Sequence, residues 1–306
     1  MNKNLAMKRV KMFGPGWIFV FSFTLAGCVQ LSKEKQHPGK QEARKSFLWK
    51  VSGSNSVVFL LGTLWSTQGP PPVNAKMEEA YSASSIVVVP YTIEEAVSSN
   101  LTEQLKSRGK YPPGETIRGH VTRPTFETLE ASFKGTTNEW ERERPWSIGL
   151  SIVHQELNRH GFNGSNSIVG HFLSKAKADK KTVVSLERPD AFLNILSALP
   201  DIQAEWCLLQ GMVESAYYST NLNEIVDAWR SGDVKKLDNI NLTHLQPFPY
   251  LTRKLTIDRN EAWLPRIEKL LAGQTNAFVI VYARHLVGRE SLIELLELKG
   301  FKVEQL

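Results

Sequence analysis

The sequence predicts an α/β fold: a mixed central β-sheet covered by helices, with a long helical insertion in the middle of the chain. Continuous runs of β-branched and apolar residues, typical of buried strands, occur at 57–61, 86–89 and 277–281. Between them, roughly residues 95–255 have mostly helical periodicity. The 306 residues are 42% hydrophobic and 22% charged, which excludes a disordered chain and a multi-span membrane protein.

The first elements of the folded body are expected to be a hairpin, a helix and a strand. Apolar segments at 47–51 and 56–61 flank the turn sequence Gly53-Ser54-Asn55. The second of these strands is apolar at every position from 57, so we expect it to be covered on both faces. A helix is expected at 74–82, and the strand at 86–89 ends at Pro90, which cannot donate to a ladder.

The middle of the chain is expected to be helical apart from one strand at 182–185. Gly232 and Asp233 are typical of a helix end followed by a new N-cap. Residues 111–122 and 248–250 are expected to be loops. The expected helices are 94–108, 124–133, 145–160, 167–178 and 190–227, the last with a break near Pro200.

The carboxyl-terminal part is expected to return to the sheet. A helix at 258–271 has apolar residues at helical spacing and ends before Gly273. Pro265 must lie in its first turn or kink it. The strand at 277–281 precedes an amphipathic helix at 290–299, and 301–305 is the last strand.

The first 46 residues are interpreted as a targeting signal followed by a tether. Residues 1–11 are basic, and the apolar stretch 12–26 has the size of a signal-peptide core, whereas a spanning helix needs ~20 residues. Leu25-Ala26-Gly27-Cys28 resembles a bacterial lipoprotein lipobox. The prediction is a lipoprotein signal peptide at 1–27, a lipidated Cys28 carrying acyl chains such as palmitate, and a flexible tether over 28–46. The alternative is an uncleaved anchor helix with an incidental cysteine.

This interpretation gives an expected location and excludes one class of partner. A lipidated Cys28 anchors the chain to a membrane of the bacterial cell envelope. By resemblance to Gram-negative lipoproteins, Val29 rather than aspartate favours the outer membrane, facing the periplasm. The net charge of +6 falls to −1 when counted from Phe47, so the basic excess lies in the leader and tether and does not indicate a nucleic-acid partner. Cys207, between apolar neighbours, is expected to be a buried structural thiol.

Residues 47–306 resemble the TraB/GumN family, relatives of the Tiki metalloproteases. The order and spacing of several stretches carry this resemblance. They are Phe47-Leu48-Trp49-Lys50-Val51 with 57–63, 171–176 with Leu186-Glu187, Trp229-Arg230-Ser231-Gly232-Asp233, Arg259-Asn260-Glu261-Ala262-Trp263-Leu264, 278–283, and His285-Leu286-Val287-Gly288.

The resemblance implies a metal-dependent chemistry. In the family, two strands each end in Gly-x-x-His and a third ends in a glutamate. Two imidazoles and a carboxylate at one sheet edge are a reasonable set of ligands for a divalent metal, which can activate water. By this resemblance the chain would be a hydrolase or protease of the Tiki-like type.

The sequence departs from this pattern at most of its ligand positions. Trp65 stands in the first Gly-x-x-His motif, and an indole nitrogen donates a hydrogen bond but cannot bind a metal. Val89 replaces the glutamate, and Tyr282 replaces the glycine of the second motif, which keeps His285. Further departures are Tyr91, where the family often has aspartate, Val169, which lies near another family aspartate, and Phe192, where the family often has glutamine.

These departures predict a pseudoenzyme that binds a peptide, glycan or protein partner and has no metal cofactor. His285, Arg259 and Glu187 are the candidate remnants of the site. Arg259 and Glu187 either form a buried ion pair or line the edge of a binding cleft, and His285 is either a structural histidine or a ligand. Two alternatives remain open. One is an active metal-dependent hydrolase with unrecognised ligands, and the other is a structural envelope protein.

Overall fold

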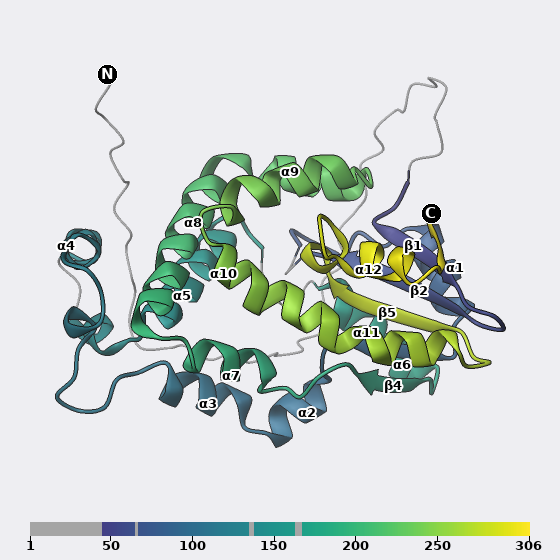
Figure 1. Cartoon of the computed structure of the whole chain (residues 1–306), viewed down its shortest axis with the longest axis horizontal. Helices are drawn as coiled ribbons and strands as arrows, with labels where there is room; N and C mark the ends of the chain where they lie inside the picture. The colour runs from purple at the N-terminus through teal and green to yellow at the C-terminus, as the bar shows by residue number, and fades with distance from the viewer. Residues whose placement is uncertain (1–44, 65–66, 135–137, 163–166) are drawn as a thin grey trace.

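The computed structural model describes residues 45–306 except 65–66, 135–137 and 163–166, and only the backbone at 242–245. The expected signal peptide and Cys28 lie outside these residues. No helix in the described ranges is long and apolar enough to cross a membrane. In Figure 1 the sheet lies at one end of the molecule, and the long helix α8 rises at the other.

One mixed sheet of six strands forms the centre of the fold, as the sequence predicts. Its order is β4-β3-β5-β2-β1-β6. The four strands from β4 to β2 are parallel, whereas β1 pairs antiparallel with both β2 and β6. The strands are β1 (Leu48–Ser52), β2 (Val57–Thr63), β3 (Ile86–Val89), β4 (Thr182–Ser185), β5 (Ala277–Tyr282) and β6 (Lys302–Gln305).

The three continuous apolar runs become adjacent strands in the middle of this sheet, which confirms their prediction. Strand β5 lies between β3 and β2, with Val88 opposite Val279 and Leu61 opposite Ile280. These positions are buried because helices cover both faces of the sheet, which is why no polar residue alternates with the apolar ones. The hairpin of β1 and β2 also forms as expected.

Helices from distant parts of the sequence pack on the sheet. Helix α1 (Ala75–Ser82) begins at the N-cap Asn74, and α6 (Ile168–Ala178) begins at the N-cap Ser167. The Phe278 ring of β5 lies 6.0 Å from the ring of Tyr81 on α1 and 4.9 Å from that of Phe172 on α6. Near the other end of the chain, α11 (Asp258–Leu271) receives two hydrogen bonds from the Ser56 hydroxyl beside β2.

The helical region is built around α5 and α8, which approach closely at two glycines. A Cβ at Gly149 of α5 would lie 2.6 Å from the Cys207 carbonyl oxygen, and one at Gly211 of α8 would lie 2.5 Å from the Gly149 carbonyl oxygen. The thiol of Cys207 is buried, as predicted. The helices of this region are α2 (Ile93–Ser98), α3 (Leu101–Arg108), α4 (Arg123–Ser132), α5 (Pro145–Arg159), α7 (Ala191–Ser197), α8 (Asp201–Arg230) and α9 (Val234–Leu245).

Two expected elements differ from the structure. The single helix expected at 94–108 is divided into α2 and α3, because Asn100 adopts the left-handed conformation with a φ of 53°. The loop expected at 248–250 is wrong, since Pro249 starts α10 (Pro249–Thr252). A π-helical turn η4 (Arg253–Ile257) then joins α10 to α11, so that Pro265 lies well inside a longer helical run.

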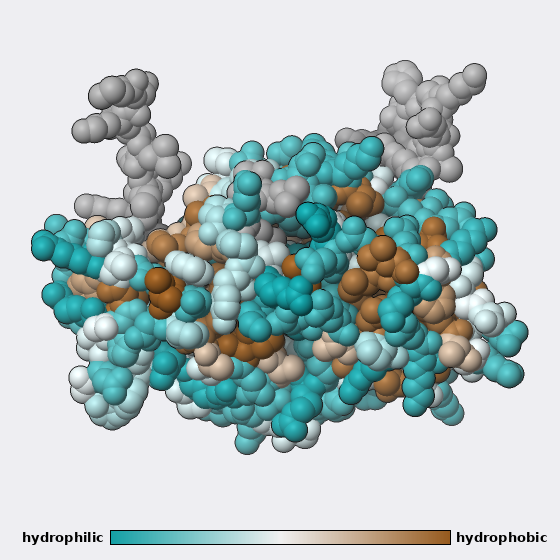
Figure 2. All heavy atoms as spheres, viewed as in Figure 1, coloured by the Kyte–Doolittle hydropathy of each residue, from teal (hydrophilic) through white to brown (hydrophobic). Residues whose placement is uncertain are grey.

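The remaining elements complete the surface. Short turns are η1 (Ile117–Gly119), η2 (Asn138–Arg142) and η5 (Ala283–Leu286), and α12 (Leu292–Leu298) precedes β6. On the face shown in Figure 2, hydrophobic residues lie in several separate patches among hydrophilic ones. Single exposed apolar side chains such as Val97 and Leu298 are ordinary for a folded protein.

Candidate functional site

The carboxyl ends of the central parallel strands define the edge at which the sequence places its candidate residues. Val89 ends β3, and Tyr282 ends β5 opposite Thr63 of β2. His285 follows on η5, the short turn after β5. Trp65 follows β2 but lies outside the described residues. The topology therefore brings Val89 and the His285 segment to one edge of the sheet.

Glu187 and Arg259 form a buried ion pair at this edge. Glu187 follows β4, and its backbone N–H donates to the Pro90 carbonyl oxygen just after β3. Arg259 on α11 donates two parallel hydrogen bonds, from Nη2 to Oε1 at 2.6 Å and from Nε to Oε2 at 3.1 Å. Trp263 Nε1, one turn further along α11, donates to the same Oε2 at 3.1 Å. Both carboxylate oxygens of Glu187 are thus occupied by donors of the protein.

His285 is held as a neutral imidazole beside this pair. Its Nδ1 lies 2.7 Å from Oδ1 of Asn260, whose Nδ2 donates to the Glu290 carbonyl oxygen at 2.9 Å. The amide orientation makes Oδ1 an acceptor, so Nδ1 of His285 carries the proton and Nε2 has the lone pair. Burial, and then the positive charges of Arg259 and Arg284, hold the pKa of His285 well below its usual value.

The residues around His285 do not fit a divalent metal. A catalytic metal usually takes three protein ligands. Val89 is fully buried and apolar, and the Glu187 carboxylate already accepts three hydrogen bonds. Within the described ranges, no group of three or more His, Cys, Asp or Glu side chains is placed to hold a metal ion. His285 Nε2 is then the one family ligand that the described edge offers.

Aromatic side chains fill the surroundings of the ion pair. The Arg259 guanidinium lies 4.7 Å from the centroid of the Trp263 ring and 5.5 Å from that of Phe192. Tyr91 is close enough for Arg259 and Glu187 to act on its hydroxyl. Burial raises the pKa of Tyr91, Arg259 opposes the rise and Glu187 adds to it, so the phenol stays protonated. Val169, on α6, packs against the main hydrophobic core.

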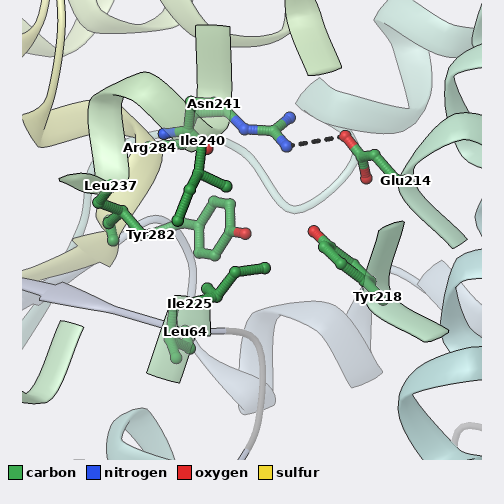
Figure 3. A pocket seen from close by; sticks show the side chains of 10 residues that line it. Leu64, Glu214, Tyr218, Ile225, Leu237, Ile240, Asn241, Tyr282 and Arg284 are labelled. Carbon is green, nitrogen blue, oxygen red and sulfur yellow. Dashed lines mark hydrogen bonds and ion pairs between the residues drawn. The ribbon is translucent and has the colours of Figure 1, made fainter. Parts of the chain in front are cut away.

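A second buried arginine–glutamate pair, which the sequence reading missed, lies next to His285. Arg284 on η5 donates from Nη2 to Oε1 of Glu214, on α8, at 3.0 Å (Figure 3). Gln210, one turn earlier on α8, donates to the same oxygen at 2.9 Å. Arg284 Nε has no hydrogen-bond partner among the described residues. No sequence signal pointed to this pair, because Glu214 lies 70 positions before Arg284 in an otherwise unremarkable helix.

A pocket adjoins this second pair. In Figure 3 the hydroxyl groups of Tyr218 and Tyr282 point toward each other across it. Burial, and then the charge of Glu214, raise the pKa of Tyr218 well above its usual value, so its hydroxyl stays protonated. The pocket lies between α8, α9 and the ends of β2 and β5, and its apolar lining consists of Leu64, Ile225, Leu237, Ile240 and Ala283.

Comparison with known proteins gives one match. A family model described as the TraB/PrgY/gumN family matches residues 47–305. No curated protein and no solved structure matches the chain. The matched segment includes every strand of the sheet and both buried ion pairs.

Proposed function

Because this chain belongs to the TraB/PrgY/gumN family, as its resemblance predicts, we propose that it is a catalytically inactive member that binds a partner. The partner is a peptide, a glycan or another protein. The protein binds it without hydrolysis and without a metal cofactor. Such a protein keeps the fold of the family but binds its partner in place of the family's metal-dependent hydrolysis.

The occupied carboxylate of Glu187 is the observation that carries this proposal. A carboxylate that accepts from Arg259 twice and from Trp263 once has about three of its four lone-pair sites occupied, which leaves it poorly placed to bind a metal or to transfer a proton. Val89 supplies no oxygen at the end of β3. His285 alone would hold a divalent ion too weakly for it to survive purification.

The same proposal places the protein on a membrane of the bacterial envelope. Removal of residues 1–27 and acylation of Cys28 would leave the body attached through a tether over 28–46. Intact-mass measurement of the membrane-extracted protein tests this. The expected mass is that of a chain starting at an acylated Cys28. A mature chain that keeps residues 12–26, or an unmodified Cys28, would contradict the anchor.

The absence of catalysis is tested by elemental analysis and a peptidase assay with added manganese or cobalt. We expect no stoichiometric metal and no metal-dependent cleavage. Near one metal per chain, lost in His285→Ala, would establish the active hydrolase instead. As the converse experiment, Trp65→His together with Val89→Glu should recover metal affinity, and Val89→Glu alone should not. Failure to capture any peptide, glycan or protein from envelope extracts would leave the structural alternative.

A further inference from the structure

We propose that one face of the long helix α8 is a two-fold contact between two copies of this chain. The face, here called the α8 stripe, consists of Ile202, Trp206, Leu209, Val213 and Ala216. Helix α8 lies at the end of the molecule away from the sheet (Figure 1). This inference goes beyond the proposed function, because it assigns a second copy of the chain to a surface that includes neither the Glu187 cluster nor His285.

The α8 stripe is apolar and open to solvent. Ile202 is 55% exposed and Val213 is 40% exposed. Trp206 and Leu209 are partly buried against a small apolar cluster that α7 and α10 contribute to. The opposite side of the helix packs closely on α5 at Gly211. Because α8 has apolar residues on two sides and the structure covers one of them, the stripe is a surface for a partner.

The absence of charge allows this partner to be a second copy of the same face. Residues 202–223 contain two charged side chains, Glu205 and Glu214, and both are buried. Each is held within the chain, Glu205 by Thr122 and Glu214 by Arg284. About 33 Å of helix therefore presents no charge to solvent. Two copies can bring these faces together without placing like charges opposite each other.

The same composition argues against a lipid surface as the partner. A helix that lies on a membrane is rich in Lys and Arg on its polar face, which interact with anionic headgroups. Residues 202–223 include neither lysine nor arginine. A second protein copy does not need them.

The spacing of the stripe fits an antiparallel pairing with itself. Its members follow one another at alternating intervals of four and three residues, which is the period of a seam between two helices. In an antiparallel pair centred on the stripe, Leu209 of one copy faces Val213 of the other. Trp206 then faces Ala216, so a large side chain meets a small one. A parallel pair would place Trp206 against Trp206, whereas a two-fold axis across the helices gives the antiparallel arrangement.

Disulfide trapping in membranes of cells that express the full-length chain tests this register. Ile202 and Thr220 are both exposed, so a cysteine at either position leaves the core intact. The two positions face each other in the antiparallel pair. Within one helix they lie about 27 Å apart, whereas a disulfide needs Cα atoms within roughly 7 Å. Under mild oxidation the double variant Ile202→Cys with Thr220→Cys should form a disulfide-linked dimer.

Each single cysteine variant is a control and should give at least tenfold less dimer than the double variant. The unmodified chain, which contains Cys28 and Cys207, gives the background. No dimer in the double variant, equal dimer in a single variant, or a disulfide to a different protein would overturn the proposal.

A matched pair of charge variants tests the contact without added cysteines. Val213→Glu places a carboxylate from each copy beside the two-fold axis. Val97→Glu adds the same charge on α2, at a valine that is 71% exposed and outside the stripe. Sedimentation velocity of the full-length protein in detergent should show a dimer whose dissociation constant rises at least tenfold in Val213→Glu and is unchanged in Val97→Glu. A monomeric unmodified chain, as a lipid-bound face would give, or equal dissociation constants for all three proteins, would overturn the proposal.

Discussion

The two buried arginine–glutamate pairs at one end of the sheet differ in how completely their hydrogen bonds are satisfied. In the Arg259–Glu187 pair, two donors of the arginine and the indole of Trp263 occupy both carboxylate oxygens. In the Arg284–Glu214 pair, one hydrogen bond joins the two side chains, and the Nε of Arg284 is unpaired within the described residues. Both carboxylate oxygens of the first pair are therefore hydrogen-bonded, whereas the second pair leaves a buried arginine donor without an acceptor among the described residues.

The largest effect is expected from Arg259→Met. The change leaves the carboxylate of Glu187, which is 10% exposed, without its cation. Breaking a buried pair in this way costs about 3–5 kcal/mol of the free energy of unfolding. Denaturant unfolding measures it. Arg253→Met, at an exposed arginine of η4 that contacts three carboxylates, is the control and should unfold close to the parent. Equal midpoints for both variants would show that the first pair contributes no more than a surface one.

A smaller loss is expected from Arg284→Met, and this difference is the direct test of the comparison. Each carboxylate keeps one neutral donor, Trp263 on Glu187 and Gln210 on Glu214. Arg284→Met, however, removes one hydrogen bond from its carboxylate where Arg259→Met removes two, and it also removes a buried donor that has no acceptor among the described residues. The cost should be about 1–3 kcal/mol in the same unfolding experiment. If Arg284→Met lowered the free energy of unfolding as much as Arg259→Met does, both pairs would contribute equally to the stability of the fold.

The third effect is a pH dependence of stability that burial and the two neighbouring arginines impose through His285. In the unfolded chain the histidine has a pKa near 6.5, and in the folded protein burial and the two guanidinium groups lower this pKa. The folded state therefore binds fewer protons, so the contribution of His285 is fully present above about pH 6.5 and is lost as the pH falls below it.

The variant His285→Gln isolates this contribution because glutamine does not titrate. Between pH 7 and pH 5.5 the parent should lose about 1 kcal/mol more of its free energy of unfolding than the variant does. Unfolding curves at both pH values supply the comparison. A parallel fall in the two proteins would place the pKa of the folded His285 near its ordinary value and weaken the assignment of a neutral imidazole.

The smallest effect is expected from Tyr218→Phe, beside the second pair. The change removes a buried hydroxyl at the pocket and keeps the ring, which packs in the main core. The free energy of unfolding should fall by about 1 kcal/mol or less. Trp263→Phe is the matched change at the first pair and should cost more, because it removes one of the three donors to Glu187. If Tyr218→Phe instead lowered the free energy of unfolding more than Trp263→Phe does, the second pair would be the one that contributes more to stability.

Periodicity and composition alone determined the framework of the protein. The runs at 57–61, 86–89 and 277–281 are apolar at nearly every position because their strands are covered on both faces, and this property can be read without knowing the partner strands. The replacements at Val89 and Tyr282 were also visible, because the family resemblance places its motif positions at the ends of the strands that the sequence predicts. These features are local in the chain, which is why they could be predicted.

Only the tertiary structure decided which charged side chains form ion pairs and how many of their hydrogen-bonding groups have a partner. Glu187 and Arg259 lie 72 positions apart, and Glu214 and Arg284 lie 70 apart, so no spacing in the sequence joins either pair. The helical turn at Pro249 and the left-handed Asn100 likewise override the local pattern. Hydrogen bonds require donors and acceptors to lie within about 3 Å of each other, and such distances between remote segments are set by packing. For this reason the difference between the two ion pairs emerges from the folded protein and not from the sequence.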